Sequence, residues 1–352
     1  MISLFHIPSS QFVASASIRN QGHRDHFYRS LAIEASLGDI EGRAAVMIRN
    51  ALDREVLPQR LTKEHSELLL FVLFQHYRTP SAAASLEQLS DGLFKRLAAR
   101  EDRMKEHLSE FRVRLWNAPA VSLRSAAEVY PMALDLELQL IRNRTAHPFI
   151  TCDHPVVLYN QFMESRQPFA SHIGVASKGL QVFMPLNPSY TLMLFDSQSY
   201  LIGGRRLRPP VVESTQPDVV QLNLLQVLNA DQQLYFNDDI DEQTIRASVD
   251  CAAELRTRVR ASVDELILPP KESSTPHSLI RIRRVPLRAD VKLSFVGKLP
   301  QAAGQGLTPS RTNYLRNPTL CDLHDRFLQA VDRKEFKLSE FSKFRQEDLK
   351  TE

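Results

Sequence analysis

LTKEHSELLLFVLFQHYRTP, residues 61–80, is the most informative segment for predicting how the chain folds. Its middle, Leu68 to Phe74, is apolar on every side of a helix, which is typical of a helix packed against neighbours all round. The residue before a proline avoids the α conformation, so Thr79 and Pro80 end this helix, and the same pair is suited to begin the next one. The stretch therefore predicts a central buried helix that leads at once into a second helix, as a helical hairpin.

Further helices and strands are predicted from the spacing of apolar residues along the chain. Recurrence every three or four positions indicates one face of a helix, and short apolar runs between Pro, Gly and Asn are typical of strands. Besides 61–77, helical segments are predicted at 36–54, 86–97 with a continuation over 104–115, 122–142, 215–236, 241–265 and 320–345. Strand-like runs cover 149–150, 156–159, 181–186, 191–195 and 279–292.

This order of elements predicts an α+β fold, in which a helical N-terminal half packs on a small, mostly antiparallel sheet, with further helices towards the C-terminus. We expect one domain over residues 1–299, helical in 1–145 and sheet-containing in 146–299. Residues 300–311 have a linker-like composition, which leaves 312–352 as a C-terminal helical appendage. The apolar stripe of that appendage needs a partner, either the body of the protein or another subunit.

Composition and charge exclude several classes of protein. The 44 basic and 41 acidic residues nearly cancel, so affinity for nucleic acid would have to come from a local patch. Three widely spaced cysteines argue against a disulfide framework and a CxxC zinc module, which favours a reducing, cytoplasmic location. The start lacks the pattern of a signal peptide, and the longest apolar run is too short to span a bilayer, so we expect no membrane partner.

The end of the central helix carries the first candidate functional side chains. Gln75 and Arg78 lie three residues apart, so they share one rim of the helix. Arginine offers a rigid fork of donors that suits a phosphate or a carboxylate, and glutamine can donate and accept beside it. The alternative is structural, with Arg78 paired to an internal carboxylate. Glu41, on an apolar helix face, is predicted to be partly buried and to pair with an arginine or to have a raised pKa.

A second candidate is the turn Thr151-Cys152-Asp153-His154-Pro155, which separates two strand-like runs. A structural turn would have Asp153 bonded to backbone N–H groups and His154 exposed. A functional turn would make Asp153 a base, a metal ligand or the partner of Arg78, with His154 as a proton carrier. His6 is a further candidate, although a lone histidine in an apolar setting is usually a packing residue.

Cofactor and metal motifs are absent from the sequence. No HxH, HxxxH or HExxH spacing supports a metal site, and metal ligation by His6, Asp153 and His154 is not expected. No glycine-rich phosphate loop occurs, so a nucleotide cofactor is not expected either, and the cofactor remains unknown.

Two polar patterns remain. Arg281, Arg283, Arg284 and Arg288, with Lys292 and Arg205, Arg206 and Arg208, are candidates for binding nucleic acid; an edge strand protected by charge would look the same. A stripe of carboxamides, Asn223, Gln226, Asn229 and Gln233, follows the helical spacing of one predicted segment. It is interpreted as a solvated face, with the reading of base edges or a clamp on a neighbouring loop as the alternatives.

Several of these segments together resemble the bacterial family of domain of unknown function four-two-three-eight. The segments are Gln75-His76-Tyr77-Arg78-Thr79-Pro80, Phe149 to Val156, Met184-Pro185-Leu186-Asn187-Pro188 and Asn223 to Ala230, and the resemblance covers roughly residues 1–240. One departure is that His6 and Pro8 are separated by a single residue, where the family has a His-aromatic-x-Pro pattern. The resemblance implies that the segments form one site, and it associates the chain with mobile elements and defence without naming a substrate.

Two hypotheses of function follow. The first is a cytoplasmic defence- or stress-type effector that binds nucleic acid or a phosphate ligand and could hydrolyse it. Arg78 would hold phosphate, and Asp153 with His6 or His154 would carry out acid–base chemistry. The second is a non-enzymatic sensor or interaction subunit in which Gln75, Arg78, Glu41 and Asp153 form a buried structural network. In that case the C-terminal helix would contact a protein partner.

Overall fold

A five-stranded sheet lies at the centre of the computed structural model, which describes residues 1–18, 21–22, 27–164, 171–204, 209–268, 277–299 and 314–351. Its strands, in spatial order, are β5 (Val157–Tyr159), β6 (Gln181–Asn187), β7 (Tyr190–Phe195), β3 (Glu137–Asn143) and β9 (Val211–Ser214). All neighbours are antiparallel except β3 and β9, which run parallel. The sheet is therefore mostly antiparallel, as expected.

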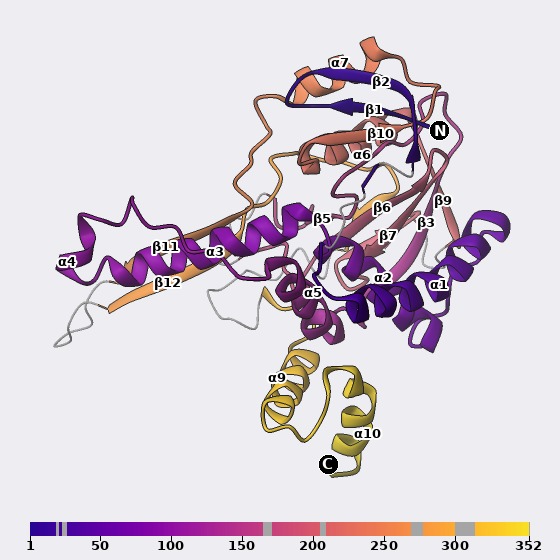
Figure 1. Cartoon of the computed structure of the whole chain (residues 1–352). Helices are drawn as coiled ribbons and strands as arrows, with labels where there is room; N and C mark the ends of the chain where they lie inside the picture. Colours follow the sequence, from indigo (N-terminus) through magenta and orange to yellow (C-terminus); the bar gives the residue numbers. More distant parts are fainter. Residues whose placement is uncertain are drawn as a thin grey trace.

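Helices cover both faces of this sheet (Figure 1). On one face lie α1 (Leu31–Arg54) and α2 (Lys63–Tyr77), and the fully buried Leu68, Leu69 and Leu73 of α2 pack in one core cluster with Leu158 and Leu194 of the sheet. On the other face lies α6 (Gln216–Asn229), which begins at a Thr215 capping box. The predicted central helix is confirmed, because α2 is nearly apolar all round and packs on several sides.

A second sheet lies beyond α6. It has the order β2 (Gln11–Ala16), β1 (Ile2–His6), β10 (Gln233–Phe236) and β4 (Thr151–Cys152), all antiparallel. Its apolar residues pack with the far side of α6 and with α7 (Glu242–Ala252). The layers therefore run from α1 and α2 through the five-stranded sheet and α6 to the smaller sheet.

An arm extends from this body (Figure 1). It consists of α3 (Pro80–Ala98), the short α4 (Asp102–Lys105) and an antiparallel ribbon of β11 (Ala261–Leu268) and β12 (His277–Arg284). Gly92 of α3 allows close packing on the ribbon, because a Cβ atom there would lie 3.1 Å from the Val263 side chain, which is a tight contact. A smaller ribbon pairs β8 (Tyr200–Ile202) with β13 (Val296–Lys298).

The C-terminal helices pack on one another and on the body. They are α9 (Pro318–Asp332), the turn η4 (Leu338–Glu340) and α10 (Phe341–Thr351), and they lie below α5 (Ala118–Val129) and the turn η2 (Tyr130–Ala133) (Figure 1). Phe327 is fully buried against Phe341 and Phe344, and His324 bonds to the Glu128 carbonyl oxygen at 2.6 Å. The stripe on α9 thus has partners within the chain.

The α+β class is confirmed, and so is the helix break at Thr79 and Pro80, where Thr79 caps α3 through a bond from the Ala82 N–H. The expected helical hairpin is wrong, because α3 packs on α5 and β11 and extends into the arm instead of folding back along α2 (Figure 1). Several predicted boundaries are wrong. The segment predicted as a helix to residue 142 ends at 129 and leads through the turn η2 to β3, because residues 139–141 are buried within a sheet and carry no helical period. In the same way, the segments 215–236 and 241–265 each end as strands, β10 and β11.

Other expectations differ in detail. Strands β1 and β2 lie within residues 1–145, which were expected to be helical, and the continuation over 104–115 contains only the single turn α4. The strand predicted over 279–292 ends at Arg284, and the last helix is broken between α9 and α10. The linker-like residues 300–311 lie outside the described residues. No helix in the described part of the chain is long and apolar enough to cross a membrane.

Candidate functional site

The two sequence segments singled out above meet at a pair of histidines, His76 at the end of α2 and His154 in the turn between β4 and β5. Their ring centroids are 4.7 Å apart, and both side chains are buried. Two short bonds fix the contact: His76 Nδ1 to the Val156 carbonyl oxygen at 3.1 Å, and Thr79 Oγ1 to His154 Nδ1 at 2.6 Å. The α2–α3 junction is thereby fastened to the central sheet.

The hydrogen bonds of His76 define its protonation. Arg284, at the end of β12, donates from one terminal nitrogen to His76 Nε2 at 2.8 Å. An arginine cannot accept, so Nε2 carries the lone pair, and Nδ1 carries the hydrogen that is donated to Val156. Burial, the neighbouring His154 and the charge of Arg284 hold the pKa of His76 well below its usual value. His76 is therefore neutral at physiological pH.

The bonds of Thr79 define the tautomer of His154 in the same way. Thr79 Oγ1 accepts from the Ala82 N–H at 3.2 Å and donates its only hydrogen to the His76 carbonyl oxygen at 3.3 Å. All three contacts of the Thr79 hydroxyl are satisfied when His154 Nδ1 donates to it, so we assign this tautomer, which leaves the lone pair on His154 Nε2. Burial, Arg260 and Arg284 lower the pKa of His154 to about 3. His154 is thus a neutral hydrogen-bond acceptor held between two positive charges.

The carboxamides of α6 hold the turn that contains His154. Asn229 Nδ2 donates to the carbonyl oxygens of His154 (2.5 Å) and Val156 (3.3 Å), and Gln226 Nε2 donates to that of Pro155 (3.0 Å). Asn223, a turn earlier, bonds to the backbone of Pro148 and Ile150, and Gln233 lies in β10 and not in the helix. Interpreting this stripe as a solvated face is wrong, because Gln226 is 2% exposed and Asn229 is 7% exposed. The stripe is a clamp on the loop.

Asp153 anchors the same turn from its other side. Its carboxylate accepts from the backbone N–H groups of Asp231, Gln232 and Gln233 at 2.8, 2.7 and 3.1 Å. Burial raises the pKa of Asp153 and outweighs the opposing effect of these bonds. Its neighbour His154, which the structural interpretation of the turn expected at the surface, is buried.

The other side chains selected from the sequence lie away from the histidine pair. Arg78 forms an ion pair with Glu41, and the Tyr28 hydroxyl bonds to the Arg78 carbonyl oxygen at 3.3 Å. Gln75 makes no side-chain hydrogen bond to any residue within the described ranges. His6 ends β1, opposite Gln233 in β10, and its Nδ1 bonds to Ser9 Oγ at 2.7 Å. Catalytic roles for Arg78, Glu41, Gln75 and His6 stay predictions.

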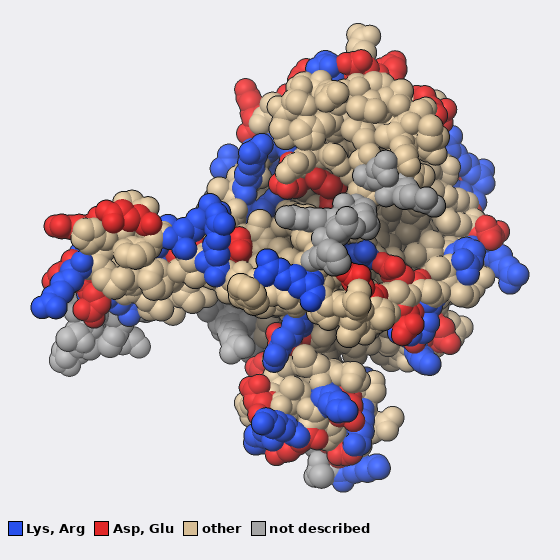
Figure 2. All heavy atoms as spheres, viewed as in Figure 1, with Lys and Arg blue, Asp and Glu red and all other residues tan. Residues whose placement is uncertain are grey.

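The arginines of the predicted basic patch do not share one environment. Arg281 and Arg283 point to one face of the ribbon and both pair with Asp264, at 2.9 and 3.2 Å, whereas Arg284 faces the histidines. Arg288 is exposed, and residues 205–208 lie outside the described residues. Figure 2 shows basic and acidic side chains interspersed over the arm and the C-terminal helices. Nucleic-acid binding by these arginines stays a prediction.

Arg260, at the start of β11, was not identified from the sequence. It donates to the carbonyl oxygens of Leu228 (3.3 Å), Asn229 (2.9 Å) and Ala230 (3.1 Å) at the C-terminal end of α6, where a cation is favoured by the helix dipole. No motif marks it, because its position depends on the contact between two elements that are distant in the sequence. Gln88 of α3 holds this segment by bonding to the Arg260 N–H and the Arg258 carbonyl oxygen.

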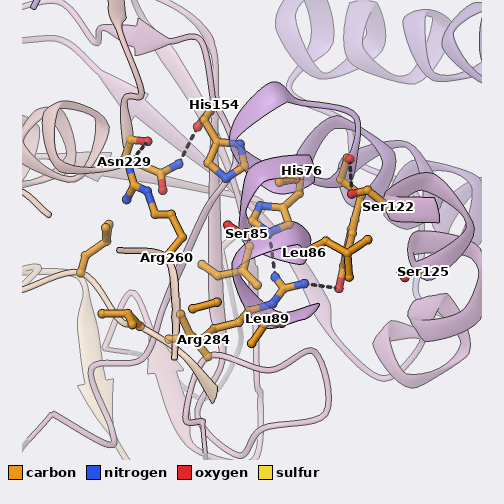
Figure 3. Close-up of a pocket in the computed structure, with 17 residues that line it drawn as sticks. His76, Ser85, Leu86, Leu89, Ser122, Ser125, His154, Asn229, Arg260 and Arg284 are labelled. Carbon is orange, nitrogen blue, oxygen red and sulfur yellow. Dashed lines mark hydrogen bonds between the residues drawn. The ribbon is translucent and has the colours of Figure 1, made fainter. Parts of the chain in front are cut away.

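These residues surround a cavity of about 250 Å³ between α2, α3, α5 and the base of the ribbon. Figure 3 shows His154 and His76 one above the other, with Arg284 reaching His76 and Arg260 lying beside Asn229. Leu86 and Leu89 of α3 and serines of α3 and α5 also line the cavity. Within the described residues, no group of three or more His, Cys, Asp or Glu side chains could hold a metal ion. The cavity can therefore offer arginine donors and a neutral imidazole acceptor.

Acidification is expected to destabilise the protein through His154. Between its folded pKa of about 3 and the unfolded value near 6.5, only the unfolded chain binds the proton, so the free energy of unfolding falls as the pH falls, by up to about 1.4 kcal/mol per pH unit. Glu164 acts in the opposite direction, because burial raises its pKa to about 7. The measurement is therefore a comparison of urea unfolding between wild type and His154→Gln at about pH 6.5 and about pH 5. Equal losses of stability in both proteins would contradict a neutral buried His154.

Comparison with known proteins gives one match. A family model described as "Protein of unknown function (DUF4238)" matches residues 1–240, which include both histidines, Thr79 and the clamp of α6. Arg260 and Arg284 lie beyond the matched range. No curated protein and no solved structure shows a significant match.

Proposed function

The chain belongs to the family of proteins of unknown function DUF4238, and we propose that it binds a phosphate-bearing ligand in the cavity beside His154, held by Arg284 and Arg260. The expected defence or stress setting is part of this proposal and is supported by the family resemblance alone. The chemistry of the cavity supports the binding of an anion directly.

The proposal depends mainly on the groups that surround Arg284. Its guanidinium contacts the neutral His76 at 2.8 Å and the Tyr77 hydroxyl at 2.6 Å, and it lies 4.8 Å from the centroid of the Tyr77 ring. It forms no ion pair with a carboxylate among the described residues. A partly buried cation without an anionic partner is costly, and a bound anion would remove that cost.

Arg284 and Arg260 both keep donors for a ligand. Each terminal nitrogen of Arg284 uses one hydrogen on His76 or Tyr77, which leaves its Nε–H and the second hydrogen of each terminal nitrogen. Arg260 donates to backbone carbonyl oxygens, and the carboxylates of Asp231 and Asp153 lie near enough to act on its charge without a direct ion pair among the described residues. The charges of Arg260 and Arg284 both lower the pKa of His154, so both guanidinium groups lie close to its ring. Two positive charges match a phosphate monoester, which carries a charge of about −1.5 to −2 at neutral pH.

His154 would link the binding of the anion to hydrolysis, because its pKa depends on whether the anion is bound. A bound anion would offset the charges of Arg260 and Arg284 and so raise the pKa of His154 towards its usual range. Its Nε2 could then accept a proton from water, so hydrolysis of a phosphate ester is the first reaction to test. In this proposal the proton acceptor is His154, since the Asp153 carboxylate is occupied by three backbone N–H groups.

The test is titration calorimetry with inorganic phosphate. Arg284→Gln is expected to weaken binding by about tenfold to hundredfold, because a charge-assisted hydrogen bond contributes about 1.5–3 kcal/mol. Arg283→Gln is the matched control, since the neighbouring arginine points to the other face of the ribbon and pairs with Asp264. Equal affinities of the two variants would contradict the proposal. Binding of RNA or DNA that depends on Arg281 and Arg288 would instead support the basic-patch prediction.

A non-enzymatic sensor or interaction subunit is the second candidate. The Arg78–Glu41 ion pair and the bonds of Asp153 to backbone amides favour it, because both are contacts that stabilise the fold. A sensor would bind phosphate with the same dependence on Arg284 but would release no phosphate from an ester. A turnover assay on phosphate monoesters therefore separates the two candidates.

A further inference from the structure

The lining of the cavity combines two kinds of chemistry. Arginines and histidines line it together with the apolar side chains of Leu86 and Leu89 of α3 and of Ile173 and Leu287. Figure 3 shows the two leucines on the side of Arg284 and away from Arg260, so an apolar wall lies next to the cationic group. A ligand that fills the cavity must therefore place an apolar surface against this wall.

The serines in the wall do not supply donors for another anionic group. Ser85 and Ser125 each donate to a carbonyl oxygen one turn back in their own helices, at 2.9 and 3.2 Å. Ser122 donates to the Tyr77 carbonyl oxygen at 2.6 Å. Since a hydroxyl has a single hydrogen, these side chains can only accept from a ligand. Negative charge is therefore favoured beside the arginines alone.

We infer that the ligand is a phosphate monoester of an apolar alcohol, with the phosphate at Arg284 and Arg260 and the organic group against Leu86 and Leu89. This inference rests on the proposed function and adds the class of ligand. The cavity of about 250 Å³ is much larger than the space that one water molecule needs, so a phosphate group leaves room for an organic group. Burial of that group against the leucines adds affinity that inorganic phosphate cannot gain.

The test compares three probes by calorimetry on the full chain: inorganic phosphate, glycerol 3-phosphate and phenyl phosphate. Phenyl phosphate is expected to bind at least about tenfold more tightly than the other two, because its ring removes apolar surface from water. If phosphate binds and phenyl phosphate gains nothing, the apolar ligand class is overturned and the proposed function stands. If none of the three binds, both are overturned.

A pair of leucine variants tests the location of the organic group. Leu89→Gln is expected to remove most of the preference for phenyl phosphate over phosphate, while the affinity for phosphate changes by less than about twofold. Leu97→Gln, on the same helix but 47% exposed and outside the cavity, is expected to keep the preference. A preference that survives Leu89→Gln unchanged would overturn the placement. The probe series on the wild type decides the ligand class even if Leu89→Gln does not fold.

Discussion

Replacing Asn229 by leucine is expected to lower the free energy of unfolding by about 2–5 kcal/mol. The Asn229 side chain is buried and donates to two backbone carbonyl oxygens, those of His154 and Val156. Leucine has a similar size but no donor, so both carbonyl oxygens would lose this partner in a place where water does not replace it. The measurement is urea unfolding followed by circular dichroism at about pH 7.5, above the range in which the histidines titrate.

The control for Asn229→Leu is Gln216→Leu, an exposed carboxamide in the first turn of the same helix. Exposed substitutions of this kind change stability by about 0.5 kcal/mol or less. If Asn229→Leu costs no more than the control, the carboxamides of α6 do not hold the turn. The interpretation of the stripe as a clamp would then fail.

Asp153→Ala is expected to lower the free energy of unfolding by about 2–4 kcal/mol, because three backbone N–H groups lose their acceptor. Asp153→Asn, which keeps one acceptor oxygen, is expected to cost less. Asp250→Ala, at an exposed position of α7, serves as the control. The measurement is again equilibrium unfolding, with phosphate binding measured on the same samples.

The Asp153 variants also separate two roles that the sequence left open. A catalytic acid or base would lose activity with little change in stability, whereas a turn anchor loses stability first. We expect Asp153→Asn to bind phosphate within about threefold of the wild type, because the carboxylate does not line the cavity. Full stability of Asp153→Ala together with loss of phosphate turnover would contradict the structural role.

Local sequence chemistry was sufficient for part of this fold. The α2–α3 junction follows from Thr79 and Pro80, whose preferences act within a few residues. The strand β3 was missed although the sequence carries its signal: Leu134, Leu136, Leu138 and Leu140 alternate with polar residues, and this period of two is typical of a strand and not of a helix. Strands β10 and β11 were missed because each follows a true helix after only a short break.

The candidate site was predictable only in part. Thr79 and His154 lie in the two segments that the sequence analysis selected, and these segments do meet. The sequence analysis, however, assigned the main roles to Arg78, which pairs with Glu41, and to Asp153, which accepts from backbone N–H groups. Arg284 was selected for its charge and not for its contact with His76, and Arg260 was not selected. The contact of Arg284 with His76 joins residues 208 positions apart, and the contacts of Arg260 with the end of α6 join residues 30 to 32 positions apart. No local spacing rule describes such contacts.

The most direct measurement is an anomalous difference map from crystals soaked in tungstate, an analogue of phosphate whose heavy atom can be located without ambiguity. The expected result is a peak in the cavity within hydrogen-bond reach of Arg284 and Arg260, which is lost in Arg284→Gln crystals and kept in Arg283→Gln crystals. A cavity that stays empty in the wild type, or a peak that persists without Arg284, would contradict an anion site between these arginines.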